Sequence, residues 1–419
     1  MAVQISTLAN GLRVVSDTMQ EAESVVIGAW VGVGTRHEPW RANGLAHMTE
    51  HMMFKGTKRR SAYALSQTIE KNGGSMNAHT TREETAYYAR VLPEAVEQAA
   101  DIIADMLLRS VFDEKELDRE RQVIVQEICS DRDTPEEYIF DLMHETAFPR
   151  QKMGRAIMGT TDVVMRLPRD SVVDYVKKYY HAGNMVLIGT GKITHDELVA
   201  LARRYFSRLP AGKPVKTESA RIKKGDLRQE KDSEQLHLMM SFPAPGLHAK
   251  NAHVAGLLGT LLGGTSSSRL FQKVREKRGL VYNISTYHMP FEDVGLFCLY
   301  AGTDPQRVKE LIPVICKELK AVTKKISPTE LARAKAQARA ELLMAKECVM
   351  RRAEILGHQI LSYGEYIPMQ DTIDQIMEVT PEQTLAMAAK ILRKPPVITT
   401  LGPTAQVESY SDIADRILH

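Results

Sequence analysis

The five residues from His47 to His51 combine two imidazoles and a carboxylate at a spacing that suits metal-dependent chemistry. The stretch reads His-Met-Thr-Glu-His, so its two histidines are four residues apart. On a helix, side chains at this spacing project from one face, where His47 and His51 can hold one zinc ion. Glu50 lies beside them and can accept a proton from an attacking water without being a ligand. The stretch therefore predicts two metal ligands and a general base on one short piece of helix, although histidines on helices are often structural and 13 histidines in the chain allow a chance match.

A hydrolytic zinc site usually has three protein ligands, so a third ligand must come from elsewhere in the chain. A predicted helix offers Glu120 and Glu127, which are seven residues apart and so lie on one face. One carboxylate can ligate the metal while the other orients a ligand. The residues alone do not decide between these roles, and both can also be solvated helix carboxylates, as most glutamates are.

Apolar periodicity predicts the elements that must position these residues. Strands are predicted at residues 12–16, 25–31, 75–80 and 85–92, where apolar residues run together or alternate with polar ones. Helices are predicted around the His47 motif, over 63–72 and over 135–146. A further helix begins at a capping box of Asp113 and Glu116 and continues to about Ser130, so it carries Glu120 and Glu127.

The order of these elements predicts an α+β protein rather than a parallel doubly wound sheet, because several strands look hairpin-connected. The charged stretch 211–235 is poor in large apolar residues and predicts a linker between a half at 1–210 and a half at 236–419. Residues 170–191 and 380–402 both read as a helix followed by a strand. Their offset of about 210 residues is half of the 419-residue chain and indicates a duplicated unit.

The composition excludes several classes of protein. With 43% hydrophobic and 26% charged residues the chain is typical of globular proteins, and a net charge of +3 is too small to indicate nucleic-acid binding. Four scattered cysteines without a Cys-x-x-Cys pair favour a reducing compartment. Residues 1–6 lack the features of a targeting peptide, and no apolar run approaches the roughly 20 residues that span a bilayer. The turn at Gly263-Gly264-Thr265 lacks the lysine of a phosphate loop, which excludes an NTPase.

Beyond the motif, several segments resemble the pitrilysin-type (M16) zinc metallopeptidases. They are residues 43–57, 72–78, 112–127, 267–282 and the tail from 351 onward. The resemblance covers nearly the whole chain and is strongest to the processing-peptidase branch, which includes bacterial peptidases and the catalytic β subunit of mitochondrial processing peptidase. Met48 and Thr49 depart from the larger apolar residues more common in that branch, but no reactive group is missing.

The resemblance implies a role for each residue of the metal site. His47 and His51 would be zinc ligands, and Glu127 would be the third, at the family's spacing after the second histidine. Glu50 would be the base, and Glu120 a supporting acid. One Zn²⁺ per chain is therefore the expected cofactor.

The resemblance also implies substrate contacts. Arg275 and Tyr282 match a pair, contributed by the second half, that binds the substrate backbone near the scissile bond. Phe54 matches an aromatic residue that lines the pocket just after the cleaved bond. Asn77 and Ala78 match a pair on a sheet edge beside the zinc.

Glu137 and Asp141 match an acidic pair that holds an arginine two residues before the cleaved bond. They are four residues apart on the helix predicted over 135–146. This spacing makes a two-carboxylate face suited to a guanidinium group, although a solvent-facing helix edge has the same pattern.

The expected protein is a zinc endopeptidase whose two similar halves, each a mostly antiparallel sheet with helices packed on it, form a clam-shell around a cavity. Its substrates would be extended peptides or presequence-like segments. A homodimer is expected, with two alternatives: a catalytic subunit that needs a heterodimer partner, or a non-catalytic scaffold subunit. Bacterial cytoplasm is the expected location, and the mitochondrial matrix is the alternative.

Overall fold

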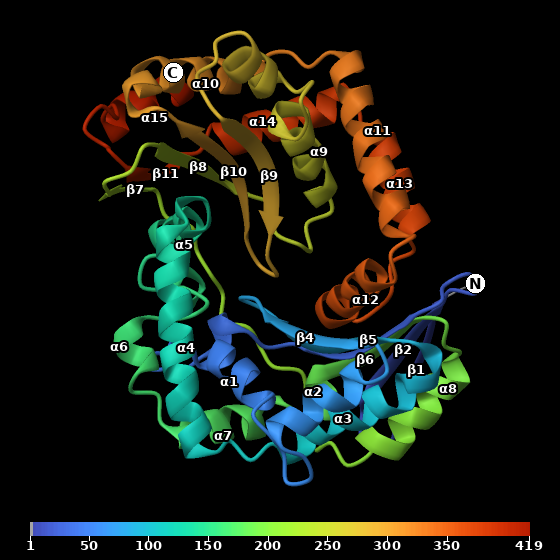
Figure 1. The fold of residues 1–419 in the computed structure, drawn as a ribbon. Helices are drawn as coiled ribbons and strands as arrows, with labels where there is room; N and C mark the ends of the chain where they lie inside the picture. Colours follow the sequence, from blue (N-terminus) through green and yellow to red (C-terminus); the bar gives the residue numbers. More distant parts are fainter. Residues whose placement is uncertain (1–2) are drawn as a thin grey trace. The chain divides into compact units, whose positions relative to one another are not determined.

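The computed structural model describes residues 3–419, so the first two residues of the segment considered for a targeting peptide lie outside it. The chain divides into two compact units, and each unit is built from separate stretches of sequence (Figure 1). The first unit contains the chain up to Ser130, Arg155–Glu218 and Met344–Ile367. The second contains Asp131–Gly154, Ser219–Leu343 and Pro368–His419.

The first unit is built on a six-stranded sheet in the order β1-β2-β6-β3-β5-β4. Its strands are β1 (Gln4–Thr7), β2 (Arg13–Thr18), β3 (Val25–Val31), β4 (Ser75–Thr80), β5 (Thr85–Val91) and β6 (Met185–Gly191). Only the pair β2 and β6 is parallel among the described strand pairs of this sheet. Its helices are α1 (Leu45–Met53), α2 (Ala62–Glu70), α3 (Val96–Arg109), α4 (Glu114–Asp133), α6 (Thr161–Val164), α7 (Arg169–Tyr179), α8 (His195–Leu201) and α12 (Val349–Tyr363).

The second unit has a five-stranded sheet in the order β7-β11-β8-β10-β9. Its strands are β7 (Gly225–Glu230), β8 (Leu236–Ala244), β9 (Asn283–Pro290), β10 (Gly295–Thr303) and β11 (Val397–Gly402). Its helices are α5 (Pro135–Ala147), α9 (Ala252–Gly263), α10 (Val308–Val322), α11 (Pro328–Ala345), α13 (Met369–Glu378), α14 (Pro381–Leu392) and α15 (Tyr410–Leu418).

The two sheets share one topology. In each sheet a late strand lies between two earlier ones and is parallel to one and antiparallel to the other. β6 is parallel to β2 and antiparallel to β3, and β11 is parallel to β7 and antiparallel to β8. The order β2-β6-β3-β5-β4 therefore corresponds to β7-β11-β8-β10-β9. The α+β class with two similar, mostly antiparallel sheets is confirmed, and the equivalent pairs α7–β6 and α14–β11 fit the predicted duplication.

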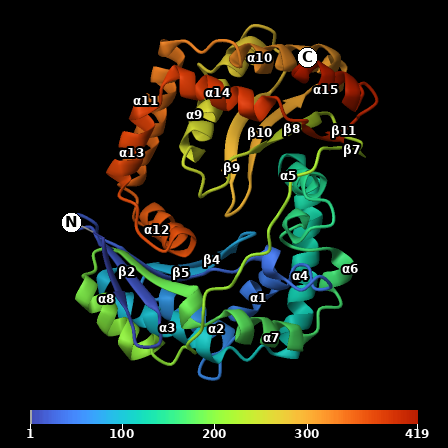
Figure 2. The same cartoon turned by 180° about the vertical axis from the view of Figure 1, so that it is seen from behind.

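Both faces of each sheet are covered by helices, because the central strands carry apolar side chains on both sides. Along β3, Ile27 packs into the core on one face and Trp30 into the core on the other. Helix α12 covers the Trp30 face, as both Figure 1 and Figure 2 show, and Arg352 of α12 forms an ion pair with buried Asp17 of β2. In the second unit α5 covers the corresponding face of its sheet.

This packing exchanges two segments between the halves of the sequence. Helix α5 comes from the first half but belongs to the second unit, and α12 comes from the second half but belongs to the first. The division into domains at 1–210, 211–235 and 236–419 stays a prediction. The compact units differ from a division at one linker, because each unit takes in a segment from the other half of the sequence. The predicted linker also contains β7, an exposed edge strand that pairs in parallel with β11.

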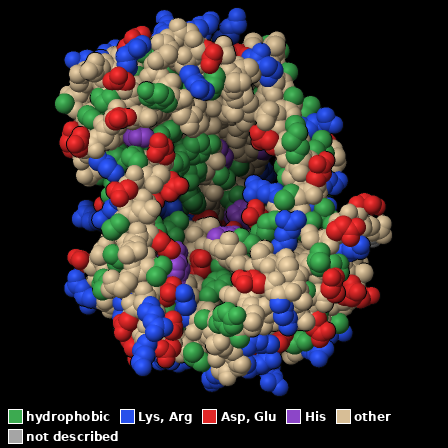
Figure 3. Space-filling view, viewed as in Figure 1, with side chains coloured by type: hydrophobic (Ala, Val, Ile, Leu, Met, Phe, Trp, Pro, Cys, Tyr) green, Lys and Arg blue, Asp and Glu red, His purple; other side chains and the backbone are tan. Residues whose placement is uncertain are grey.

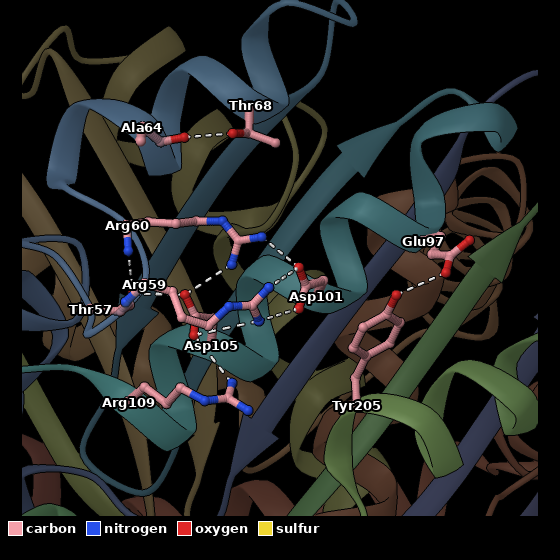
Figure 4. A network of polar contacts seen from close by, with 10 residues as sticks. All are labelled: Thr57, Arg59, Arg60, Ala64, Thr68, Glu97, Asp101, Asp105, Arg109 and Tyr205. Carbon is pink, nitrogen blue, oxygen red and sulfur yellow. Dashed lines mark hydrogen bonds and ion pairs between the residues drawn. The ribbon is translucent and has the colours of Figure 1, made fainter.

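A polar network fixes the loop that follows α1 against α3 (Figure 4). The carboxylate of Asp105 is fully buried and accepts hydrogen bonds from Thr57 Oγ1 at 2.7 Å, Arg60 at 2.9 Å and Arg109 at 3.1 Å. Asp101, one turn earlier on α3, also pairs with Arg60. The buried charge is tolerated because donors surround it.

The surface mixes charges of both signs. On the face drawn in Figure 3, Lys and Arg side chains are interspersed with Asp and Glu side chains over each unit. Within residues 3–419, none of the helices combines the length and the apolar character needed to cross a membrane.

Candidate metal centre

Helix α1 presents its two histidines because its other face is apolar. Met48 and Met52 are fully buried in the core of the first unit, whereas His47 and His51 are only partly buried. The helix starts after Gly44, whose φ of +90° is a left-handed conformation that favours glycine. The imidazoles thus lie at the border of the core, where a metal ion can reach them.

The structure brings together the three residues expected to bind zinc. One ligand atom from each of His47, His51 and Glu127 lies within 4.8 Å of the other two. His51 Nε2 is 3.6 Å from Glu127 Oε2, and the two imidazole ring centroids are 4.5 Å apart. Glu127 comes from α4, so the cluster joins two helices that are distant in sequence.

The protonation state and the free ring nitrogen of His47 fit a zinc ligand. Burial lowers the pKa of His47 to about 3, with a smaller contribution from the charge of His51, so this imidazole is neutral as a ligand must be. His47 Nδ1 is buried and has no hydrogen-bond partner among the described residues. Two imidazoles and one carboxylate are a donor set that catalytic zinc sites use, with a fourth position open.

Glu120 supports His51 rather than joining the ligand cluster. His51 Nδ1 donates to Glu120 Oε2 at 2.9 Å, and Lys55 Nζ lies 2.7 Å from Glu120 Oε1. Burial raises the pKa of Glu120, but the hydrogen bonds from His51 and Lys55 outweigh it, so the net pKa is lowered. An ionised carboxylate behind a metal-binding imidazole fixes the ring orientation and its tautomer.

Glu50 is partly buried beside the ligands and is held by β4. The hydroxyl of Thr80 donates a hydrogen bond to Glu50 Oε2. Burial raises the pKa of Glu50, while the Thr80 hydrogen bond and the charge of His51 oppose this shift, and the net pKa lies above its ordinary value. A carboxylate with a raised pKa suits a group that must take up and release a proton.

Two family models divide the chain between them. Residues 13–161 match "Insulinase (Peptidase family M16)", and residues 166–338 match "Peptidase M16 inactive domain". A Rickettsia felis relative, "Uncharacterized zinc protease", is 34% identical over 95% of this chain and 97% of its own length. The chain belongs to peptidase family M16. It is a zinc metalloprotease of that family, and Zn²⁺ is its cofactor.

A second relative supports the M16 assignment, and two solved structures share the fold of this chain. The zinc protease YmxG of Bacillus subtilis is 31% identical over 96% of this chain and 99% of its own. A Helicobacter pylori protease has a TM-score of 0.88 at 21% identity, covering 96% of this chain and all of that one. A chain of Complex III2 from Candida albicans has a TM-score of 0.90 at 19% identity, over 99% and 100% of the two chains. At such identities the structures show the fold alone.

The predicted substrate residues of the first unit lie on β4 and at the end of α1. β4 is the terminal strand of its sheet in the described part of this M16 peptidase. Asn77 is exposed on it, and its Oδ1 accepts a hydrogen bond from the backbone N–H of Ala78 at 2.8 Å. Phe54 follows α1 and is partly buried, with its ring centroid 6.4 Å from that of Tyr87. Their contacts with substrate stay predictions.

The other predicted substrate residues belong to the second unit. Arg275 and Tyr282 are exposed, Tyr282 by 68%, and the Arg275 guanidinium stacks 4.7 Å from the ring centroid of Phe271. Glu137 and Asp141 lie on α5, and both raise the pKa of Asp131, which reaches about 6 chiefly through burial. Asp131 therefore adds a third carboxylate to the predicted pair.

Sequence reasoning missed Thr80, Lys55 and Asp131. Lys55 had a local signal, since it stands four residues after His51 and so lies on the same side of the helix end. Asp131 precedes Glu137 across the break between α4 and α5, where helical spacing does not apply. Thr80 reaches Glu50 only because β4 packs beside α1, a contact between distant parts of the sequence.

Proposed function

We propose that this M16 protease is an endopeptidase in which His47, His51 and Glu127 hold one catalytic zinc ion and Glu50 is the general base. The observation that carries the proposal is the grouping of the three ligand atoms within 4.8 Å, with Glu50 on the same helix as two of them. The hydrogen bond from His51 to Glu120 supports the role of the histidine as a ligand.

The residues around the cluster suggest how hydrolysis proceeds. A bound zinc ion supplies Lewis-acid polarisation of the scissile carbonyl and lowers the pKa of water. Glu50 accepts a proton from the attacking water, and the Thr80 hydroxyl holds the carboxylate in place for this step. Glu50 then returns the proton to the leaving amine nitrogen.

We propose that the substrate is an extended peptide or presequence-like segment that adds to the sheet beside β4. Backbone hydrogen bonds to an edge strand give affinity without reading the side-chain sequence. Asn77 and Ala78 would take part in this pairing, and Phe54 would contact the residue after the cleaved bond. Arg275 and Tyr282 would bind the substrate backbone near that bond; their exposed side chains support this role.

The purified chain alone is expected to bind one zinc ion, to cut peptides in a library, and to lose activity with a chelator and regain it with zinc. Mass-spectrometric mapping of the cut sites measures this outcome, and metal analysis measures the zinc. Zinc without cleavage until a second protein is added would favour the heterodimer alternative over the homodimer expected from the sequence. A chain that does not bind zinc at all would contradict the proposed site and leave the scaffold alternative.

We propose that Glu137 and Asp141 make the enzyme favour arginine two residues before the cleaved bond. Replacing that arginine by alanine in a peptide is expected to lower kcat/KM for the wild type. The double variant Glu137→Ala/Asp141→Ala is expected to cleave both peptides at similar, lower rates, since an exposed or partly exposed carboxylate–guanidinium pair contributes about 0.2–1 kcal/mol. Rates for the four combinations of enzyme and peptide measure the effect.

Glu136→Ala is the matched control for this preference. Glu136 is also exposed on α5, but its charge acts on His237 and Tyr300 rather than on Asp131. The control should keep the arginine preference of the wild type. Equal loss of preference in Glu136→Ala would assign the effect to net charge instead of the pair.

A further inference from the structure

The zinc helix begins without a side chain to cap it. The first amides of an α-helix have no partner within the helix, and a Ser, Thr, Asp or Asn side chain usually satisfies them. Position 44 cannot supply one, because a Cβ there would lie 2.5 Å from the carbonyl oxygen of Met158. Gly159 packs equally closely, since a Cβ at that position would lie 2.4 Å from the Asn43 carbonyl oxygen. The close approach of these two segments excludes a side-chain cap at position 44.

The carboxylate of Glu38 takes the place of the missing cap. Its Oε1 accepts hydrogen bonds from the backbone N–H of Ala46 at 2.8 Å and of Gly44 at 3.1 Å. Its Oε2 accepts a hydrogen bond from Asn43 Nδ2 at 3.2 Å. Glu38 is fully buried, and its negative charge lies at the N-terminus of α1, where the helix dipole favours it.

Arg155 neutralises this buried charge and ties it to the surrounding loop. Its Nη2 lies 3.3 Å from Glu38 Oε2, and its Nη1 donates to the Trp40 carbonyl oxygen at 2.9 Å. The guanidinium also stacks 5.4 Å from the centroid of the Trp40 ring. Burial raises the pKa of Glu38 to about 7, against the hydrogen bond from Ala46 and the charge of Arg155. A buried carboxylate is costly, so one so fully surrounded by donors indicates a specific role.

We infer that Glu38 is a positioning residue for the zinc site, which it serves by fixing the first turn of α1. Ala46, whose amide Glu38 binds, directly precedes the ligand His47. The His47 ring must meet Glu127 on another helix, and ligand geometry has to hold within about 0.5 Å. Arg155 acts through Glu38 by holding its carboxylate in place. This inference rests on the zinc site proposed above.

Glu38→Gln is expected to weaken zinc binding about 10- to 100-fold, the usual effect of losing a group that orients a metal ligand. Glutamine keeps the volume but replaces one carboxylate oxygen by an NH₂ group. Either the amides of Gly44 and Ala46 or the side chains of Asn43 and Arg155 then face a donor instead of an acceptor. At saturating zinc, kcat should fall while KM changes little, because the substrate edge at β4 is untouched. Competition with a chelating dye measures zinc affinity, and peptide cleavage at saturating zinc measures kcat and KM.

Asp105→Asn is the matched control, because it changes an equally buried and equally paired carboxylate. Asp105 holds the loop after α1 through Thr57 and Arg60 (Figure 4). Among the described residues, none of its hydrogen bonds goes to the backbone of α1. It should lower the melting temperature to a similar degree and leave zinc affinity near the wild-type value. Arg155→Met combined with Glu38→Gln should weaken zinc binding little more than Glu38→Gln alone.

Equal zinc affinity in Glu38→Gln and wild type would overturn the inference, as would an equal loss of affinity in Asp105→Asn. If Glu38→Gln does not fold, Arg155→Lys decides the point: it keeps a positive charge but loses the planar contacts with Trp40. It should then weaken zinc binding measurably, and an unchanged affinity would overturn the inference. Zinc binding by the wild type is measured separately. A wild type that binds no zinc would contradict the proposed function, whereas a wild type and a Glu38→Gln variant that bind zinc equally would contradict only the role of Glu38.

Discussion

Glu50→Gln is expected to lower kcat about 100- to 10,000-fold while the protein still binds zinc. The amide keeps the size of the side chain but cannot accept a proton from the attacking water. Glu50 lies between the two histidines but is not one of the three grouped ligand atoms, so the metal content should stay the same. Metal analysis and cleavage at saturating peptide concentration measure the two quantities separately.

Thr80→Val tests the same proton transfer with a smaller change. It keeps the carboxylate of Glu50 and removes only the hydroxyl that donates a hydrogen bond to it. We expect a smaller fall in kcat, with KM nearly unchanged, and recovery in Thr80→Ser. Thr68→Val is the matched control, since it removes a hydroxyl that donates to the Ala64 carbonyl on α2 (Figure 4). Cleavage by Glu50→Gln at the wild-type rate would show that Glu50 is not the base.

Elements with a strong apolar pattern could be predicted from the sequence. β3 has the predicted bounds, 25–31, because the strand is buried along its whole length. α4 starts directly after Asp113, whose carboxylate accepts hydrogen bonds from the N–H groups of Lys115 and Glu116, as the capping signal predicts. β7 was not predicted, because its residues are charged and exposed and only the distant pairing with β11 holds them. Local pattern thus predicts elements that bury a face.

The site was predictable to the extent that its geometry is local. His47 and His51 share a helix, so their spacing alone places both on one face, where they can bind one metal ion. The contact from Glu120 to His51 spans 69 residues, and that from Thr80 to Glu50 spans 30. Spacing within one element cannot reveal such contacts, and only the family resemblance separated Glu127 from Glu120 in advance. The exchange of α5 and α12 between the units depends on which face of each sheet is apolar and must be buried by a helix. This packing also joins distant parts of the sequence.

Four glutamates around one short helix acquire different tasks from their surroundings. Glu38 accepts hydrogen bonds from backbone amides at the start of α1, and Glu120 accepts a hydrogen bond from the imidazole of His51. Glu50 has a hydroxyl donor and a raised pKa, whereas Glu127 faces both histidines. Because the residue type is the same, the hydrogen-bond partners and the burial of each carboxylate distinguish the four proposed roles: capping the helix, orienting a histidine, accepting a proton and binding the metal. The proposed roles can therefore be separated by replacing each carboxylate with its amide.

Glu127→Gln is expected to remove stoichiometric zinc, whereas Glu120→Gln is expected to weaken zinc binding only about 10- to 100-fold. Glu127 contributes one of the three grouped ligand atoms, and an amide oxygen is a much poorer zinc ligand than a carboxylate. Glu120 acts one step away, through the ring of His51 and the ammonium of Lys55. Its loss leaves all three ligands in place but frees the imidazole to rotate. Zinc titration against a competing chelator measures both variants.

Asp118→Asn is the control on the same helix, because Asp118 is exposed and pairs only with arginine 121 among its described ion pairs. It should bind zinc as the wild type does. Adding zinc at high concentration should restore activity to Glu120→Gln, since its ligand set is complete, but not to Glu127→Gln. Restoration of both variants would mean that Glu127 is not a required ligand. A greater loss of zinc affinity in Glu120→Gln than in Glu127→Gln would reverse the assignment of the two glutamates.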